Sequence, residues 1–291
     1  AFWREAVLER ESFCTGGQNA GEFWIPAGHL AEFAGENNQE HCTVYNMIRT
    51  ADYLYRWTGE SRYADYIERN IYNGLLAQQH PGAGMVAYFL PMGGGYHKGG
   101  EKGWGHPTMD FFCCHGTLVQ AQTRYLEYIY FTSDAGLTVS QYIPSDLDWS
   151  FDGKKVVVSQ DFSVKDFGSD FGENRWRMNI NVKAESPVGF SLTLRVPWWV
   201  KGKPVVKVND EDVKSAVKEG YLTINREWND DKVFVEFPTE LYTEPLPGLK
   251  DAYAFMEGPI VLAAIADQEV LLHGDPSKPE TILAPEYHQQ Y

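Results

Sequence analysis

The chain has 291 residues, which is enough for one large domain or two ordinary ones with a sizeable buried core. Its formal net charge of −15 argues against nucleic-acid and anionic-membrane partners, because both need a basic face, and favours a small or neutral partner. No apolar run reaches the length of a transmembrane helix, and 14% aromatic residues suit either an aromatic core or a groove that stacks on sugar rings.

The first part of the chain has the apolar spacing of α-helices. Apolar residues recur at this spacing in four stretches, which we predict to be helices: residues 1–13, 39–57, 61–79 and 116–130. Ser61 stands where a helix N-cap is expected. The glycine-rich stretch 18–38 has little periodicity and predicts a long loop, and such loops are often functional. Residues 85–91 form a short apolar run.

After residue 132 the apolar pattern changes to the alternation of β-strands. Turn residues bound seven predicted strands: residues 136–143, 155–160, 177–184, 189–196, 205–208, 221–224 and 232–237. Several short strands at this spacing predict an antiparallel β-sandwich. An apolar run at residues 258–264 predicts a buried strand that returns to the first domain. We therefore expect domains at residues 1–132 and 133–265, followed by a poorly packed tail at residues 266–291.

The chain contains four cysteines: Cys14, Cys42, Cys113 and Cys114. The last two are adjacent, and a disulfide between neighbours would close a strained ring, so metal binding is favoured over disulfide formation. Glu40 precedes Cys42 by two residues. This carboxylate and the thiols of Cys42, Cys113 and Cys114 offer a complete four-ligand set for zinc. Cys14 lacks ligand spacing and is expected to be a buried apolar thiol.

Local backbone geometry limits how these ligands can meet. On a regular helix Glu40 and Cys42 would point about 200° apart, so they can share a metal only where the backbone is extended or just entering the helix. Cys113 and Cys114 are expected just ahead of a helix, where free N–H groups lower the pKa of a thiol. A closed four-ligand site is usually structural. A redox-active thiol pair is a further reading, although the usual two-residue spacer is absent.

Several motifs of the chain come in the order seen in one enzyme family. They are Thr15-Gly16-Gly17, Gly21-Glu22-Phe23, Glu40-His41-Cys42, Gln79-His80-Pro81, Tyr88-Phe89-Leu90-Pro91 and Phe112-Cys113-Cys114. In this series the chain resembles the β-L-arabinofuranosidase family, glycoside hydrolases of the family 127 and 146 type that use a zinc-bound cysteine. The resemblance covers roughly residues 1–265, and the two cysteine motifs are its most specific part.

The resemblance implies a role for each matching residue. The implied zinc ligands are Glu40, Cys42, Cys113 and Cys114. Cys113 also matches the nucleophile, and Glu22 matches the general acid/base. In the implied reaction Cys113 attacks the anomeric carbon while Glu22 protonates the departing oxygen, and water then releases the sugar with net retention.

Other polar residues near these motifs remain candidates. Glu32 and Glu36 are rival acids in the loop that holds Glu22. Tyr88 and His115 are candidates for sugar contacts, although Tyr88 suits core packing equally well. His41 and His106 are further candidates for sugar contacts.

The resemblance also implies an architecture and a substrate. The fold would be an α + β multidomain one, with the C-terminal part of an (α/α)6 barrel followed by an antiparallel β-sandwich. Such a barrel needs far more helices than the sequence predicts before residue 133, so an N-terminal barrel half is expected upstream. The implied substrate is β-linked L-arabinofuranose or a related plant-derived sugar. The alternative is a non-catalytic carbohydrate-binding or structural module with a structural zinc site. Either a cytoplasmic or a periplasmic location is compatible with the sequence.

Overall fold

The structure is a computed structural model that describes Trp3, Val7 and residues 12–106, 108–109, 111–162, 175–264, 266 and 270–283. The helix predicted over residues 1–13 lies almost wholly outside this part of the chain. The chain divides into two compact units, which we describe separately. The helical unit comprises Ala1–Trp57, Tyr66–Arg124 and Leu241–Tyr291, and the sheet unit comprises Thr58–Asp65 and Tyr125–Glu240.

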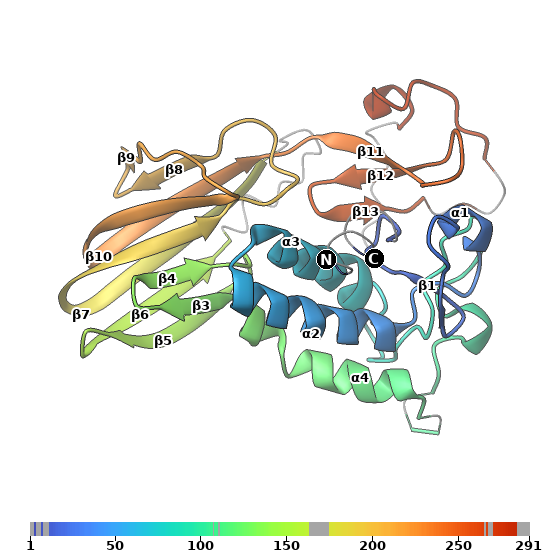
Figure 1. The fold of residues 1–291 in the computed structure, drawn as a ribbon, viewed down its shortest axis with the longest axis horizontal. Helices are drawn as coiled ribbons and strands as arrows, with labels where there is room; N and C mark the ends of the chain where they lie inside the picture. The colour runs from blue at the N-terminus through green and yellow to red at the C-terminus, as the bar shows by residue number, and fades with distance from the viewer. Residues whose placement is uncertain are drawn as a thin grey trace. The chain divides into compact units, whose positions relative to one another are not determined.

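Helices α2 (His41–Thr58), α3 (Ser61–Asn70) and α4 (Cys113–Gln122) are the main helices of the described chain (Figure 1). One face of α2 is apolar and buried, with Val44, Ile48 and Ala51 at helical spacing. The helix predicted over residues 61–79 is confirmed as far as Leu76, but its second part is the π-helical segment η2 (Ile71–Leu76). Short helical turns complete the set: α1 (Leu30–Phe33), η3 (Gly100–Lys102), η4 (Tyr125–Tyr128) and η5 (Pro279–Thr281).

Two sequence expectations for this region are corrected. The stretch predicted as a loop contains a small hairpin of β1 (Asn19–Ala20) and β2 (Phe23–Trp24), joined by the two-residue turn Gly21-Glu22. The last predicted helix begins at Cys113 instead of residue 116, because the backbone of the cysteine pair is already helical. It ends at Gln122, before the separate turn η4.

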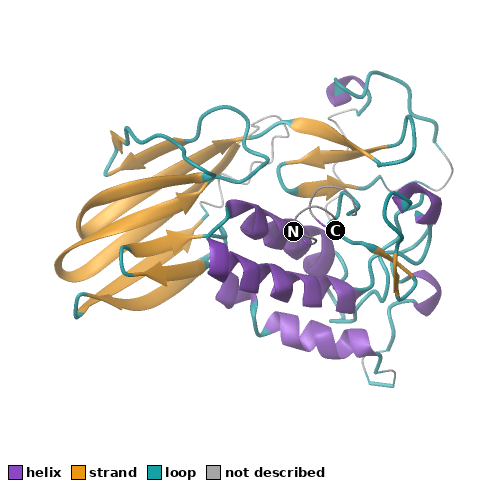
Figure 2. Cartoon of the chain, in the orientation of Figure 1, coloured by secondary structure: helices purple, strands orange, loops and turns teal. Residues whose placement is uncertain are grey.

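The sheet unit is built on one eight-stranded sheet (Figure 2). Its main path runs β3 (Tyr130–Ser133), β4 (Gly136–Val139), β7 (Arg175–Arg195), β10 (Tyr221–Pro238), β8 (Val205–Val208) and β9 (Glu211–Asp212). Strands β5 (Ser145–Phe151) and β6 (Lys154–Asp161) branch from β7. Pairing is antiparallel except between β4 and β7, which run parallel. The sheet is therefore mixed rather than purely antiparallel.

Two long strands replace four of the predicted short ones. Strand β7 joins predicted segments 177–184 and 189–196, and β10 joins 221–224 and 232–237. Pro187 lies between the two predicted segments of β7, and proline lacks an N–H for the ladder. The register between β7 and β10 shifts between Trp228 and Asp230, opposite this point, so Pro187 falls between the paired stretches. The long strand can continue through the proline for this reason.

A three-stranded sheet of β11 (Leu241–Pro245), β12 (Tyr253–Glu257) and β13 (Ile260–Leu262) belongs to the helical unit. The Asn73 side chain holds β13, since it donates to Pro259 O at 2.7 Å and accepts from Val261 N at 2.8 Å. The predicted return of residues 258–264 to the first domain is confirmed, although β13 is only partly buried. The domain bounds expected from the sequence, residues 1–132, 133–265 and 266–291, stay predictions.

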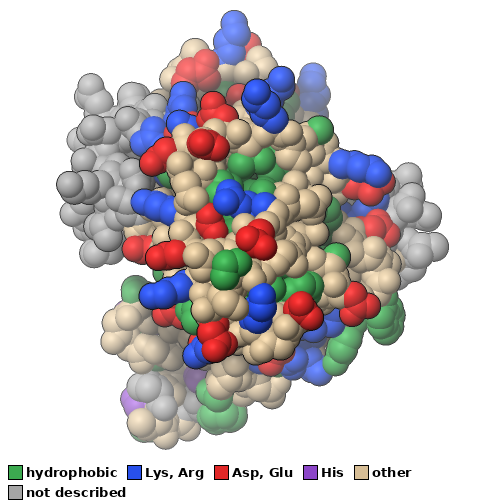
Figure 3. Space-filling model, turned by 90° about the vertical axis from the view of Figure 1, so that its left-hand side faces the viewer, with side chains coloured by type: hydrophobic (Ala, Val, Ile, Leu, Met, Phe, Trp, Pro, Cys, Tyr) green, Lys and Arg blue, Asp and Glu red, His purple; other side chains and the backbone are tan. Residues whose placement is uncertain are grey.

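The surface charges and the helices of the described residues are those of an ordinary globular chain. Acidic and basic side chains intermingle on the face shown in Figure 3, without a large area of one sign. Among the described residues, no helix is both long and apolar enough to cross a membrane. The fold is thus a mixed α/β one, and the partial (α/α)6 barrel and the β-sandwich stay predictions.

Candidate active site

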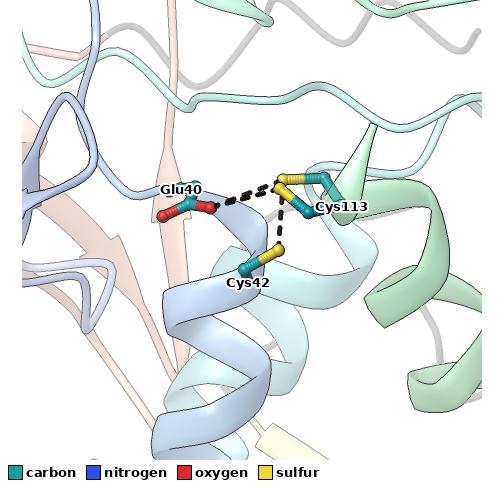
Figure 4. A group of neighbouring side chains, drawn as sticks. Glu40, Cys42 and Cys113 are labelled. Atoms are coloured by element: carbon teal, nitrogen blue, oxygen red, sulfur yellow. Dashed lines mark hydrogen bonds between the residues drawn. The ribbon is translucent and has the colours of Figure 1, made fainter. Parts of the chain in front are cut away.

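Four potential metal ligands at the starts of two separate helices meet in the helical unit (Figure 4). The donor atoms of Glu40, Cys42, Cys113 and Cys114 all lie within 4.8 Å of one another. The sulfurs of Cys42 and Cys114 are 3.6 Å apart. Oε1 of Glu40 lies 3.8 Å from the Cys113 sulfur and 3.9 Å from that of Cys114. The structure therefore brings together the whole ligand set that the sequence predicts.

The start of α2 lets Glu40 and Cys42 face one point. Glu40 precedes the helix, and its carbonyl accepts the Val44 N–H at 3.1 Å, while Cys42 lies in the first turn. The 200° separation of a regular helix therefore does not apply, as the sequence reading requires. Thr43 Oγ1 donates to Glu40 Oε2 at 3.2 Å and leaves Oε1 directed at the sulfurs.

The start of α4 places Cys113 and Cys114 in its first turn. Phe112 precedes the helix, and its N–H donates to Nδ1 of His115 at 3.0 Å. This bond fixes the bend by which the chain enters the helix. Cys114 is fully buried, whereas Cys113 is exposed. The two neighbouring thiols consequently differ in their access to solvent.

A buried amide ties Glu40 to the hairpin that carries Glu22. Asn19 is 1% exposed. Its Oδ1 accepts the Glu40 N–H at 3.2 Å, and its Nδ2 donates to Gly21 O at 2.6 Å. Gln78 supports the same segment, since its Nε2 donates to Gln39 O at 2.9 Å. These bonds fix the backbone of both elements without using their functional side chains.

The four donors suit a zinc ion. Zinc accepts thiolate and carboxylate ligands in a tetrahedron, and zinc–sulfur bonds of about 2.3 Å separate two ligand sulfurs by about 3.8 Å. The 3.6 Å between the sulfurs of Cys42 and Cys114 is close to this edge. A set of three sulfurs favours zinc over magnesium or calcium, which prefer oxygen ligands. The donors and their spacing therefore fit the predicted ion.

Without a cation, the thiols do not all ionise readily. The sulfurs of Cys42 and Cys114 are in hydrogen-bond contact, and this contact lowers the pKa of Cys42 and raises that of Cys114. Partial desolvation, with the neighbouring Cys42 and Glu40, raises the pKa of Cys113. The expectation that the helix start lowers the pKa of both adjacent thiols therefore does not hold for the bare site. The repulsion among these groups is what a bound cation would relieve.

Tyr88 connects the candidate acid/base with the candidate nucleophile. Its hydroxyl donates to Glu22 Oε1 at 2.5 Å and lies 3.2 Å from the Cys113 sulfur. The ring is 4% exposed and contacts the rings of Phe89 and Phe112, which confirms core packing, and its sugar contact stays a prediction. Desolvation and the hydrogen bonds to Cys113 and Glu22 raise the pKa of Tyr88, which keeps the phenol protonated.

The other candidate residues lie outside the four-donor cluster. Glu32 is exposed and pairs with His29 at 2.9 Å, and Glu36 is also exposed. Nδ1 of His106 accepts backbone N–H groups of its own loop. His115 is 8% exposed and caps α4 with Nδ1, so its proposed sugar contact stays a prediction. Cys14 lies apart from the cluster, and burial raises the pKa of its thiol to about 11.

The sequence analysis missed two supporting side chains, Thr117 and Asn19, and named His41 only as a candidate for sugar contacts. Thr117 lies 3.5 Å from the Cys42 sulfur and 2.9 Å from Nδ1 of His41. Its spacing of three residues from Cys114 puts both on one helix face, which is a signal that the sequence contains. Burial lowers the pKa of His41 to about 4 and keeps the imidazole neutral. Asn19 has no comparable signal, because its partners Glu40 and Gly21 are joined only in the folded chain.

The chain matches two family models. The model for the β-L-arabinofuranosidase GH127 catalytic domain matches residues 1–127, and that for the GH127 middle domain matches residues 136–239. No curated protein matches the chain.

Solved structures share the fold. A GH127 β-L-arabinofuranosidase from Geobacillus stearothermophilus T6 has a TM-score of 0.71 at 24% identity, over 89% of this chain and 41% of that one. Another GH127 β-arabinofuranosidase has a TM-score of 0.70 at 21% identity, over 88% of this chain and 42% of that one. A third structure, described as a glycoside hydrolase, has a TM-score of 0.68 at 20% identity, over 89% and 46%. The chain spans less than half the length of each. Because these two family models match it, the chain belongs to the GH127 β-L-arabinofuranosidase family.

Proposed function

We propose that the chain supplies the nucleophile, the general acid/base and the metal ligands of a retaining glycoside hydrolase that releases β-linked L-arabinofuranose or a related plant-derived sugar. The proposal rests on one observation above all. A single hydroxyl, that of Tyr88, contacts both Glu22 and Cys113 beside a four-donor cluster. Membership of the GH127 family supports the substrate class. The substrate is accordingly a small carbohydrate, with neither nucleic acid nor membrane as partner.

The proposed ligands of the zinc ion are Glu40, Cys42, Cys113 and Cys114. When bound, the ion supplies the positive charge that keeps the sulfurs as thiolates at neutral pH. Cys113 is the exposed thiol of the cluster, whereas Cys42 is partly buried and Cys114 is buried. This difference supports Cys113 as the group that attacks the anomeric carbon, with Cys114 and Cys42 as ligands only. An exposed nucleophilic sulfur also favours catalysis over a purely structural zinc site.

The proposed role of Glu22, which lies in the hairpin turn, is proton transfer. Its carboxyl would first donate a proton to the departing oxygen and then take a proton from the water that releases the sugar. Since Tyr88 contacts both groups, Glu22 Oε1 and the Cys113 sulfur are no further apart than the two hydrogen bonds combined. This upper limit is compatible with the ~5–5.5 Å between the two carboxyl groups of retaining glycosidases. Two displacements at the same carbon then give net retention.

Tyr88 would orient these two groups. Its phenol stays protonated, so it can donate to the ionised form of Glu22 or to the Cys113 thiolate, but not to both at once. When Cys113 attacks and Glu22 gives its proton to the substrate, the negative charge passes from the sulfur to the Glu22 carboxylate. The Tyr88 hydroxyl can then turn from Cys113 to donate to Glu22. The deep packing of the ring holds the oxygen in place during this exchange.

The test uses an aryl arabinofuranoside, because nitrophenol leaves without protonation. Glu22→Gln should still form the sugar–Cys113 thioether from this substrate but release it slowly, since no base activates water. Intact mass spectrometry should then show one added pentosyl group per chain, and peptide mapping should locate it on the peptide containing Cys113. Cys113→Ser should show neither adduct nor turnover. Glu32→Gln and Glu36→Gln are matched controls from the same part of the chain and should behave as the parent chain.

The alternative is a non-catalytic carbohydrate-binding or structural module. In that case the sugar would bind, zinc removal would lower stability alone, and no aryl arabinofuranoside would be cleaved. The partial (α/α)6 barrel, the β-sandwich and an N-terminal barrel half belong to the same proposal as the activity. Assay of the chain with and without its upstream sequence tests whether the chain is active alone.

A further inference from the structure

Thr117 joins the two halves of the candidate metal site through one oxygen atom. Its Oγ1 lies 3.5 Å from the Cys42 sulfur and 2.9 Å from Nδ1 of His41, both on α2. The same hydroxyl donates to the carbonyl of Cys114 on its own helix, at 3.1 Å. The Thr117 hydroxyl therefore contacts both helices that supply the sulfurs, α2 and α4.

The hydrogen-bond capacity of these groups defines how the contact works. A threonine hydroxyl has one proton to donate and two lone pairs that accept. While it donates to Cys114 O, it can accept the Nδ1–H of His41. Nε2 of His41 is buried and has no hydrogen-bond partner among the described residues, which favours the proton on Nδ1, where it has a partner. His41 thus holds the hydroxyl oxygen in position.

The ionised form of Cys42 changes what the hydroxyl can do. A thiolate only accepts hydrogen bonds, so the Thr117 proton is the donor available to it across the 3.5 Å contact. Side chains that hydrogen-bond to metal ligands in this way fix ligand orientation and tune the metal. The bond from His41 leaves the oxygen in place while its proton turns from Cys114 O to the sulfur.

The local bond to the helix backbone does not by itself explain this arrangement. Thr123, at the end of the same helix, donates to Gln120 O at 2.8 Å with the same spacing of three residues. Thr123 is exposed and contacts no member of the cluster in the described chain. Thr117 differs because it also reaches α2, which makes Thr123 its matched control.

We propose that Thr117 is a positioning residue for the metal site, which holds the Cys42 sulfur through its hydroxyl and is itself held by His41. The inference rests on the proposed function, because it takes the cluster to bind a metal ion. The inference adds the contacts of Thr117 and His41 around Cys42 to the four donor atoms of the site.

The test compares Thr117→Val, Thr117→Ser and Thr123→Val in the full chain. Each protein is loaded with Zn²⁺, and the rate of zinc transfer to a chromogenic chelator is measured. Thr117→Val should lose zinc about 10-fold faster than the parent chain, the lower range for loss of such a contact. Thr117→Ser and Thr123→Val should stay within about twofold of it. With Co²⁺ as probe, only Thr117→Val should shift the sulfur-to-metal charge-transfer absorption.

The outcomes separate this inference from the proposed function. If the parent chain binds neither Zn²⁺ nor Co²⁺, both fail. If it binds them and Thr117→Val loses zinc at the parental rate with an unshifted spectrum, only the role of Thr117 fails. Equal effects of Thr117→Ser and Thr117→Val would also overturn it, because side-chain packing rather than the hydroxyl would then matter. Circular dichroism checks folding, and Thr117→Ala replaces Thr117→Val if the latter does not fold.

Discussion

The hydroxyl oxygen of Tyr88 lies 3.2 Å from the sulfur of Cys113. The ring belongs to the core cluster that contains Val86, Phe89 and Cys114, so the buried interior sets the position of this polar atom. The hydroxyl is bonded to Glu22 as well. One residue therefore determines how the exposed hairpin turn and the start of α4 are aligned.

Replacement of Tyr88 by Phe should lower kcat/KM for an aryl arabinofuranoside by about 100-fold, the usual loss when one preorganised donor is removed. The ring keeps its packing, so the thermal unfolding midpoint should change little. Tyr142→Phe is the control, because that buried hydroxyl donates to Arg195 O in the sheet unit. Unchanged kinetics for Tyr88→Phe would contradict the proposed alignment of Glu22 and Cys113.

The cluster should hold one zinc ion per chain by native mass spectrometry. Replacement of Cys42 or Cys114 by Ser should abolish tight binding, because each removes one of four donors. Removal of zinc should lower the unfolding midpoint by about 5 °C or more, since metal binding energy contributes to folding. Cys14→Ser is the matched cysteine control and should retain the ion. Full zinc content in the Cys42 variant would exclude this ligand set.

The cluster was predictable from sequence, whereas its surroundings were not. Glu40 and Cys42 stand at a helix start that the apolar pattern locates, and Cys113 and Cys114 stand at another. The hairpin that presents Glu22 has two-residue strands, which are too short to show periodicity. Pro187 divides the sequence of a strand that the structure continues through a register shift. Such features depend on partners distant in the chain, so local patterns do not contain them.

A buried ion pair should contribute strongly to the stability of the sheet unit. Arg195 is fully buried, and its Nη1 lies 2.5 Å from Oδ1 of Asp65. Asp65→Asn leaves the guanidinium charge without its counter-charge and should cost about 3 kcal/mol in urea unfolding. Asp148→Asn is the control, because its pair with Lys155 is exposed and should contribute less than about 0.5 kcal/mol. If Asp65→Asn and Asp148→Asn lowered the free energy of unfolding by the same small amount, the charge of Asp65 would not be required to stabilise buried Arg195.

Glu236 should make the stability of the sheet unit depend on acidic pH. Although burial opposes it, hydrogen bonds from Arg177, at 2.8 Å, and from Arg175 lower the pKa of Glu236. A carboxyl with a lowered pKa stabilises the fold fully above its unfolded pKa of about 4.3, and this stability is lost as pH falls through the folded value. The contribution should therefore be constant at neutral pH and decline below about pH 4.

Glu236→Gln tests this sign directly. Its free energy of unfolding should be about 2 kcal/mol below that of the parent chain at pH 7, because hydrogen bonds to a charged group are lost. The difference should shrink at pH 3, where the parent carboxyl also becomes neutral. Glu227→Gln, an exposed change on the same strand, should differ little from the parent chain at either pH. A difference for Glu236→Gln that is equal at pH 7 and pH 3 would mean that packing, not charge, explains it.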